Sequence, residues 1–421
     1  MKWLLKKTFD FIQDPNSFSQ YLKEPIFFTR KRCLSFPVVA STILNLFKES
    51  VEYNISTILP DLSSKVVTGA AFSKARYKIS LSFFKDLNKI VSDYHKQHPS
   101  QLWRGYQLIA GDGSTVGLPP SSQMKDFFGI YSEKGGSIKS CMAQIFMFYD
   151  VFSGAILSKR ISKMEHTEKT LFNSCLGELP SSKSIVILDR GFGYFHIFKK
   201  LCILNQDFCI RISSAQSCFA KRIIQEISND LITEWDPSLK EIGSCIKYGL
   251  DTKKIMARVT KIELRTGEIE VLVSSLSDIK DVCQVNIKAL YGLRWPVEEG
   301  FKKLKPKMKL EQFGSRKPDG IFQEFEAHIF MINLIALFGI QAQQEIDKDK
   351  KTRLKYKYNW QNAFRFVRKV IIQILNTVNP EDIIQPLIKL IASSKIPIKP
   401  DRSFARITFK KRKNRLQQTY K

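Results

Sequence analysis

Two apolar runs, each leading into an aspartate, limit most strongly what this chain can fold into. The run Ser184–Leu188 (SIVIL) meets Asp189, and a run at 108–110 (LIA) is followed by a glycine and Asp112. Continuous apolar runs between polar segments are typical of strands buried in a sheet. We therefore expect each strand to end at its aspartate, at the rim of a sheet, where open α/β folds bind their ligands.

Aspartate is also a common turn residue after a strand, so either one alone has a purely structural interpretation. A third acid, Glu298, follows further along the chain, and no histidine or cysteine lies near the three. Three carboxylates from separate segments describe a site of hard oxygen ligands, which suits Mg²⁺ or Mn²⁺ rather than zinc. Two such ions about 3.5–4 Å apart could activate an attacking oxygen and stabilise a leaving one at a phosphorus centre.

The segment 291–305 (YGLRWPVEEGFKKLK) places four different polar groups at helical spacing. Tyr291, Arg294, Glu298 and Lys305 are separated by 3, 4 and 7 residues. On a helix of about 100° per residue they fall within roughly 60° of arc. We expect Arg294 and Lys305 to hold phosphate oxygens, and Tyr291 to donate a hydrogen bond or to pack on a sugar.

Other residues bear on the same chemistry. Glu299 lies about 100° round the helix from its acidic neighbour, so only one of the two can face the aspartates, and the spacing favours Glu298. Pro306 disfavours helix at the preceding lysine, so the helix prediction is firmest in the middle of the segment. Trp235 or Trp295 could stack on a base flipped out of the DNA, although a core position is commoner for either.

The charge balance points to a polyanionic partner. The 421 residues include 67 Lys and Arg against 40 Asp and Glu, a formal net charge of +27. Nucleic acid is the commonest partner of such a chain. An anionic membrane surface or a compositional bias towards lysine would give the same balance. Nine Lys or Arg residues and one aspartate fall in the tail 399–421, which we expect to act as an electrostatic arm for DNA.

The remaining composition indicates a soluble, cytoplasmic protein. The eight cysteines are scattered without a C-x-x-C pair, which disfavours a zinc ribbon and suggests a reducing compartment. The N-terminus has only a three-residue apolar run before two lysines, unlike a signal peptide. The longest apolar run, Ile329–Ile340, is too short to span a bilayer, and we expect a buried core helix there. His166 and His196 show no ligand spacing and are interpreted as structural.

The chain divides by pattern into helical and mixed regions. Residues 1–105 show apolar positions at helical spacing. Within them Arg76 and Lys78 belong to a basic cluster on a predicted helix at 70–79. Such a helix could lie in a DNA major groove, although a solvated helix face explains each residue as simply. From about residue 106 strands alternate with helices, which indicates an α/β fold with a mixed sheet.

A β-rich stretch interrupts this alternation. Residues 205–285 are predicted to be mostly strands, including GSCIKYGL at 243–250 and two long strands joined by a turn at 265–268. Helices resume after it, and the chain beyond residue 340 is helical and basic.

Three motifs together resemble the DDE transposases of insertion-sequence family four. They are GDGST around Asp112, LDRGF around Asp189, and a match to the family signature Y-x₂-R-x₃-E-x₆-K. The signature is matched by Tyr291, Arg294, Glu298 and Lys305. The resemblance implies a catalytic triad of the two aspartates and Glu298, an RNase H-like core and two divalent metal ions per active site. It also implies cut-and-paste transposition through a hairpin at the element's ends.

The resemblance covers residues 106–340 and, with the patterns above, implies five regions. We expect a helical N-terminal DNA-end-binding domain at 1–105, the first part of the catalytic core at 106–204, a β-rich insertion at 205–285, the second part of the core with the glutamate helix at 286–345, and a helical basic C-terminal region at 346–421.

The predicted function is therefore DNA transposition by metal-dependent phosphodiester cleavage, hairpin formation and strand transfer. The expected partners are double-stranded DNA, both the inverted-repeat ends of the element and the target, and a second copy of the chain in the DNA complex, with no membrane. The expected location is the prokaryotic cytoplasm, associated with the nucleoid. One alternative is a transposase-derived, sequence-specific DNA-binding protein that does not cut; another is a basic structural nucleic-acid protein. The three intact acids argue against both.

Overall fold

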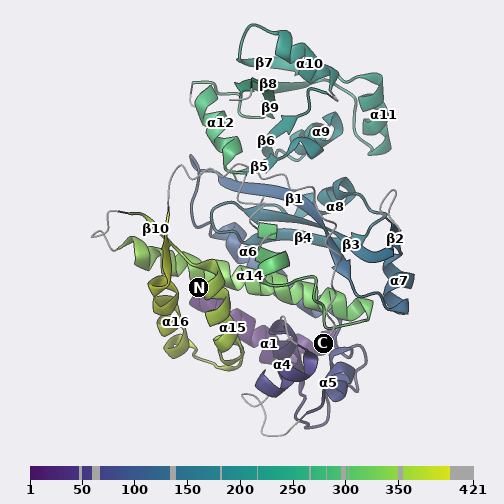
Figure 1. Ribbon diagram of the computed structural model, residues 1–421, viewed down its shortest axis with the longest axis vertical. Coiled ribbons are helices and arrows are strands. Elements are labelled where there is room, and N and C mark those ends of the chain that lie inside the picture. Colours follow the sequence, from purple (N-terminus) through teal and green to yellow (C-terminus); the bar gives the residue numbers. More distant parts are fainter. Residues whose placement is uncertain are drawn as a thin grey trace.

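A nine-stranded mixed sheet runs from the top of the molecule to its middle in the view of Figure 1. The computed structural model describes residues 1–46, 50–58, 67–132, 139–180, 183–215, 217–264, 267–280, 282–294, 300–301, 303–348 and 354–398. The strand order is β2-β3-β1-β5-β6-β9-β8-β7, and β4 pairs with β3. The strands are β1 (Gln107–Leu118), β2 (Tyr131–Ser132), β3 (Lys139–Asp150), β4 (Ile156–Lys163), β5 (Ser184–Leu188), β6 (Asp207–Ile212), β7 (Asp230–Trp235), β8 (Ile255–Glu263) and β9 (Ile269–Ser274).

Antiparallel and parallel pairing meet at strand β1. Strands β1, β3 and β4 are antiparallel neighbours, whereas β5 pairs parallel to β1, and β6 parallel to β5. Every residue of β5 is buried, as expected for an apolar strand covered on both faces. The predicted α/β class with a mixed sheet is thereby confirmed.

Strand β1 does not end at Asp112, contrary to the sequence-based expectation. Its antiparallel pairing with β3 runs on to Leu118, whereas its parallel pairing with β5 stops at Ala110. The Gly-Asp-Gly sequence looks like a turn, but the long apolar strand β3 supplies hydrogen-bond partners along its whole length. The aspartate therefore lies at the point where β1 loses one of its two neighbours.

The strands of the predicted β-rich stretch extend the same sheet. Strand β6 pairs with β9, β9 with β8, and β8 with β7, all antiparallel. The long hairpin of β8 and β9 is confirmed, and residues 265 and 266 of its turn lie outside the described part of the chain. The strand expected at 243–250 is wrong, because α11 (Leu239–Lys247) occupies most of it. A capping box of Ser238 and Glu241 starts that helix.

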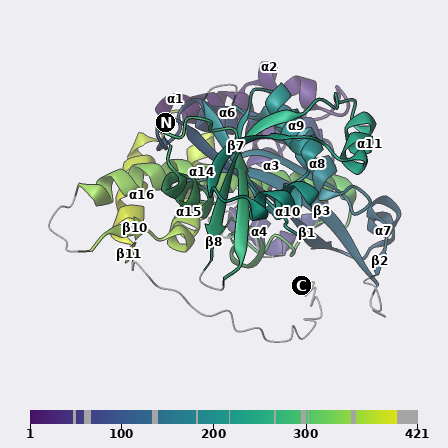
Figure 2. The same cartoon turned by 90° about the horizontal axis from the view of Figure 1, so that it is seen from above.

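Helices cover both faces of the sheet. Before it come α1 (Lys2–Gln13), α2 (Pro15–Phe18), α3 (Phe36–Leu44), α4 (Val51–Ile58), α5 (Gly69–Arg76) and α6 (Leu81–Gln97). Within and after it come α7 (Ser122–Phe128), α8 (Glu168–Cys175), α9 (Phe195–Ile203), α10 (Cys218–Gln225), α12 (Gln284–Gly292), α14 (Pro318–Asp347), α15 (Trp360–Asn376) and α16 (Glu381–Ser393). In both overall views α7 and α16 lie at opposite sides of the molecule (Figure 2).

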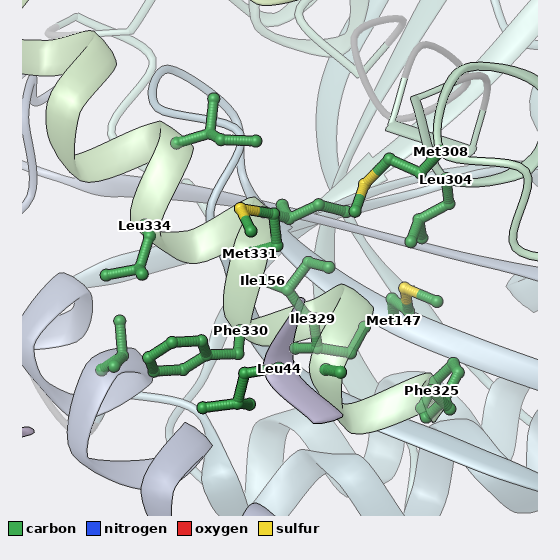
Figure 3. Packing of buried hydrophobic residues seen from close by; sticks show 14 of the residues in the cluster. Leu44, Met147, Ile156, Leu304, Met308, Phe325, Ile329, Phe330, Met331 and Leu334 are labelled. Carbon is green, nitrogen blue, oxygen red and sulfur yellow. The ribbon is translucent and has the colours of Figure 1, made fainter. Parts of the chain in front are cut away.

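Helix α14 is the buried core helix that the apolar run predicted. It contacts α6 and β4 as well as α3, α15 and α16. In Figure 3 its Phe330 lies beside Leu44 of α3, while Met147 and Ile156 of the sheet lie on another side of the helix. By length and composition α14 could cross a membrane, but 89% of its most apolar window is buried inside the protein. Burial in a protein core explains its apolar character.

Two apolar clusters lie on the two faces of the sheet. Leu108 and Ala110 of β1 join the cluster that contains α6 and α14, whereas Ile109 joins a second cluster with α8 and α9. This alternation follows from the two-residue period of a strand. It means that successive residues of β1 at the sheet rim also point to opposite faces.

Candidate active site

The two predicted catalytic aspartates lie at equivalent positions on adjoining parallel strands. The last registered pair of β1 and β5 is Ala110 with Ile187, and each aspartate follows two residues later in its own chain segment. Asp189 caps the short 3₁₀ turn η4 (Arg190–Phe192), where its side chain accepts a hydrogen bond of 2.8 Å from the backbone N–H of Gly191. Asp112 accepts one of 2.9 Å from its neighbour Gly113. The structure thus brings both carboxylates to one rim.

Tight packing holds β1 against its neighbours at this rim. A Cβ atom at Gly111 would lie 2.7 Å from the Phe148 ring and 2.9 Å from Leu188. Real Cβ atoms do not approach other atoms so closely, so only glycine allows β1 to pass here without displacing β3 or β5. The glycine before Asp112 therefore fixes the backbone that carries the carboxylate.

A further carboxylate, which the sequence analysis missed, lies beside the two aspartates. Glu168 begins helix α8, after the N-cap Thr167. Burial, together with the negative charges of Asp112 and Asp189, raises the pKa of Glu168 to about 7, against the opposing effects of the Gly113 backbone N–H and of Lys169. An acid in the first turn of a helix is a common feature of helix N-termini, so no pattern in the sequence distinguishes Glu168 from other such acids.

The chain segment that follows Glu298 contacts the neighbourhood of Asp112. A Cβ atom at Gly300 would lie 2.8 Å from the ring of Tyr149, and the Phe301 ring centroid lies 5.9 Å from that of Tyr149. Burial raises the pKa of Tyr149, and the charge of Asp112 adds to the shift. Glu298 itself, with Trp295 and Glu299, lies outside the described residues.

Tyr291 and Arg294 lie on the Asp189 side of the rim. The Arg294 guanidinium is 5.8 Å from the centroid of the Tyr291 ring. Burial raises the pKa of Tyr291 to about 12; Arg294 and Arg211 act to lower it, whereas Asp189 and Glu270 raise it. Arg211 is held by an ion pair of 2.6 Å with Glu270.

Lys305 contacts strand β1 directly. Its ammonium donates a hydrogen bond of 2.7 Å to the Ser114 hydroxyl and a second to the carbonyl oxygen of Thr115. Burial lowers the pKa of Lys305, and Glu311 acts in the opposite direction. The structure therefore places this ammonium beside the stretch of β1 that carries Asp112.

Tyr291 and Lys305 do not lie on one helix, so the helical spacing does not hold at the two ends of the segment 291–305, where its prediction was weakest. Helix α12 ends at Gly292, and Lys305 lies in the π turn η5 (Lys303–Lys307), which contains Pro306. Proline removes a backbone N–H and clashes with the preceding turn, so a regular helix cannot continue through this position. Tyr291 and Lys305 reach the rim from separate elements.

Arg76 is not available to DNA in this structure, which corrects the prediction made from its basic cluster. It is 1% exposed, and its guanidinium pairs with Glu324 at 2.9 Å. It also donates to the side chain of Gln323 and to the backbone of Gly320. Lys78 is half-buried, with its ammonium 5.0 Å from the centroid of the Phe27 ring, and its role in DNA binding stays a prediction.

Trp235 cannot serve as an exposed stacking platform either. It is completely buried and stacks on Phe219 with ring centroids 4.3 Å apart and planes 2° apart. Of the two interpretations of Trp235, base stacking and a core position, the structure therefore agrees with the core position.

The donor set at the rim fits a hard divalent cation. Asp112 and Asp189 offer oxygen ligands, and the pKa of Glu168 is raised by burial first and then by the charges of these two aspartates. Within the described ranges no three His, Cys, Asp or Glu side chains converge closely enough to hold an ion. The third predicted ligand, Glu298, is not among those ranges. Oxygen ligands without histidine or cysteine suit Mg²⁺ or Mn²⁺.

A mixed sheet in which β1, β3 and β4 are antiparallel neighbours, β5 and β6 run parallel to β1, and helices cover both faces is consistent with an RNase H-like core. Residues 103–334, more than half of the chain, match the family model described as the transposase DDE domain. The chain belongs to this family of DDE transposases, which are metal-dependent enzymes that cut and join DNA.

Two similar proteins agree with this assignment. The chain is 20% identical over 413 residues to the transposase InsG for insertion sequence element IS4 of Escherichia coli (strain K12), covering 94% of this chain and 90% of that relative. It also resembles the piggyBac transposase in a synaptic complex with hairpin DNA, with a TM-score of 0.50 and 9% identity over 93% of this chain and 85% of that one. The likeness to the piggyBac structure supports the predicted RNase H-like fold, and the family prediction is confirmed.

Proposed function

We propose that this transposase moves its element by cutting each end, closing a hairpin, reopening it and joining the freed 3′-OH to target DNA, with Asp112, Asp189 and Glu298 as its catalytic carboxylates. The observation that carries the proposal is the matched position of the two aspartates, each two residues beyond the last paired residues of β1 and β5. The contacts of Gly300 and Phe301 with Tyr149 support a position for the glutamate segment close to Asp112.

The three acids would hold Mg²⁺ or Mn²⁺, two ions in each active site. Bound there, the metal would supply charge stabilisation at the phosphorus centre. The residues of the chain would orient the DNA. Arg294 and Lys305 would carry the positive charges for phosphate oxygens, and the Tyr291 ring centroid lies 5.8 Å from the Arg294 guanidinium.

The proposed partners are the two inverted-repeat ends of the element and the target DNA, bound by a dimer of the chain. The helical region 1–105, with Lys78 but without Arg76, would recognise the ends. The basic tail 399–421, which lies outside the described residues, would add affinity for any DNA. The protein would work in the cytoplasm of its host cell, on the nucleoid.

Cleavage of an end by the purified full-length protein tests the proposal. The substrate is a labelled duplex carrying an inverted repeat from the DNA that flanks the gene, incubated with Mg²⁺, with Mn²⁺, with Ca²⁺ or with a chelator. We expect nicked and hairpin products with Mg²⁺ and Mn²⁺ only, because Ca²⁺ binds with looser geometry. Full activity after exhaustive chelation would rule out the mechanism.

Matched substitutions at the acids identify the site. Asp112→Asn, Asp189→Asn and Glu298→Gln should each abolish cleavage and leave end binding intact, because the basic surface binds DNA. Glu299→Gln should be much milder. Loss of cleavage in Glu299→Gln but not in Glu298→Gln would show that the other glutamate is the catalytic one. Specific end binding by wild-type protein without any cleavage would favour the alternative of a DNA-binding protein that does not cut.

A further inference from the structure

Beyond the sheet rim, strand β5 leaves one edge of strand β1 open. The pairing of β1 with β5 stops at Ala110, whereas its pairing with β3 continues to Leu118. Backbone N–H and C=O groups on the open edge still need hydrogen-bond partners. In a strand, the groups of residues two apart point to the same edge. Thr115 and Gly117 are two apart, and both bond to side chains of the segment 305–311.

Two charged side chains take the place that a neighbouring strand would have on this edge. The Lys305 ammonium donates a hydrogen bond to the carbonyl oxygen of Thr115. The Glu311 carboxylate accepts one of 3.1 Å from the backbone N–H of Gly117. Gly117 is buried, so without this carboxylate its N–H would lose its partner away from solvent. Along β1 the lysine therefore lies between two acids, Asp112 before it and Glu311 after it.

The turn between these two side chains is fixed in the protein core. Leu304, Met308 and Leu310 are completely buried. The N–H of Leu310 donates to the carbonyl oxygen of Leu304 at 3.0 Å, which closes the turn. Lys309 has a φ of 52°, in the left-handed region, where the chain reverses its direction. The reversal returns the next residues to β1, and Glu311 is the residue that bonds to the strand.

We propose that Glu311 is a positioning residue for DNA cleavage. By fastening the end of the turn to Gly117, it keeps the Lys305 ammonium beside the stretch of β1 that carries Asp112. A lysine side chain is a flexible stem with a point charge at its end, so its position depends on what holds the backbone around it. Glu311 itself does not touch DNA and acts through Lys305. The inference rests on the proposed role of Lys305 as a ligand of phosphate oxygens.

A purely structural role for Glu311 makes different predictions. If Glu311 only stabilised the turn, its loss would lower the melting temperature but leave the cleavage rate of bound DNA unchanged well below that temperature. The effect would also be independent of Lys305. A positioning role instead lowers the rate of the bound complex, and this loss disappears when Lys305 is already absent.

The first test measures single-turnover cleavage of labelled end DNA with Mg²⁺ over a range of concentrations of the full-length protein. We expect Glu311→Ala to lower the rate at saturating protein by about tenfold and to leave the half-saturating protein concentration unchanged. Glu311→Gln keeps an oxygen acceptor for the Gly117 N–H and should restore most of the rate. The control Glu241→Ala removes a carboxylate that likewise accepts from a backbone N–H, that of Ser238 at 2.8 Å, and should cleave like wild type.

The second test is a double-mutant cycle with Lys305→Ala. Glu311→Ala should slow this variant no further, because residues that act through one another are not additive. Glu311→Asp withdraws the carboxylate by one methylene and replaces the alanine variant in both tests if that variant does not fold, with a smaller loss expected.

The outcomes separate this inference from the proposed function. A wild-type cleavage rate in Glu311→Ala, or losses that multiply in the double variant, would overturn the positioning role while the role of Lys305 stands. If Lys305→Ala alone cleaves like wild type, the proposed role of Lys305 fails, and the positioning role fails with it.

Discussion

Lys305 donates a hydrogen bond of 2.7 Å to Ser114, two residues after Asp112 on the same strand. The contact ties the turn η5 to the rim of the sheet and brings a positive charge beside the proposed metal site. The Lys305 charge could bind a DNA phosphate, or it could only hold the turn η5 against β1. Substituting Lys305 and Ser114 separately distinguishes the two roles.

We expect Lys305→Ala to slow end cleavage by roughly tenfold or more, since a hydrogen bond to a charged group contributes about 1.5–3 kcal/mol. Ser114→Ala should be much milder, because the ammonium keeps its charge and its bond to the Thr115 carbonyl. Single-turnover cleavage of labelled end DNA measures both. Equal losses in the two variants would mean that Lys305 acts as a tether and not as a phosphate ligand.

Arg294→Lys should slow hairpin formation more than first-strand nicking. The substitution keeps the charge but loses the planar fork that binds two phosphate oxygens at once, and a strand end must be held in place between the two steps. Resolving nicked and hairpin products on a denaturing gel gives both rates. If Arg294 only orients its surroundings through the Tyr291 ring, 5.8 Å away, the two rates should fall together.

Arg76→Ala should destabilise the protein by about 3–5 kcal/mol, because it leaves Glu324 buried without its partner. Lys74→Ala, on the exposed side of the same helix, is the control and should be within about 0.5 kcal/mol of wild type. Urea denaturation gives both values. End-DNA affinity, measured well below the melting temperature, should not change in Arg76→Ala. A variant that melts normally but loses end binding would restore Arg76 as a DNA contact.

The stability of the protein should fall in acid partly through His196. Burial lowers the pKa of His196 to about 4, helped by the charges of Lys169 and Lys200, against 6.5 for a free histidine. The unfolded chain therefore takes up the proton first. The contribution is fully present above about pH 6.5 and is lost as the pH falls towards 4.

His196→Phe keeps the ring that stacks on Tyr248, with centroids 4.8 Å apart, and removes the titration. The loss of unfolding free energy between pH 7 and pH 4.5 should be smaller in this variant by on the order of 2 kcal/mol. Urea denaturation at the two pH values measures it. The control variant His166→Phe, changed at an exposed position, should lose as much unfolding free energy between the two pH values as wild type. A loss in His196→Phe as large as that of wild type would contradict the prediction.

The parts of the fold that follow from local pattern could be predicted from the sequence. The apolar run of β5 and the aspartate after it lie where the pattern put them, and the run in α14 is a core helix. The sequence pattern predicts too short a strand β1, because the continuation of β1 past Asp112 depends on its pairing with β3. The strand predicted at 243–250 is wrong because Leu239, Ile242 and Cys245 repeat every three residues, the spacing of the helix that forms there.

The errors at charged residues share one physical cause. The partner of Arg76 is Glu324, 248 positions away, and no local pattern distinguishes a buried arginine from a solvated one on a short helix. Glu168 was overlooked for the same reason: its significance lies in β1 and β5, which the fold brings to it. Sequence motifs identify acids by their neighbours in the chain, whereas electrostatics depends on neighbours in space.

Helix α14 packs against three regions that the sequence motifs treat as separate parts of the chain. It packs on α6 and α3 from the N-terminal region, on α15 and α16 from the C-terminal region, and on β4 of the sheet. A fragment that starts at the first strand would leave this apolar helix open to water and prone to aggregate. Because of these contacts, the terminal regions of different transposases could not be exchanged in evolution as independent domains. A new N-terminal region would have to arrive with side chains that already complement α14.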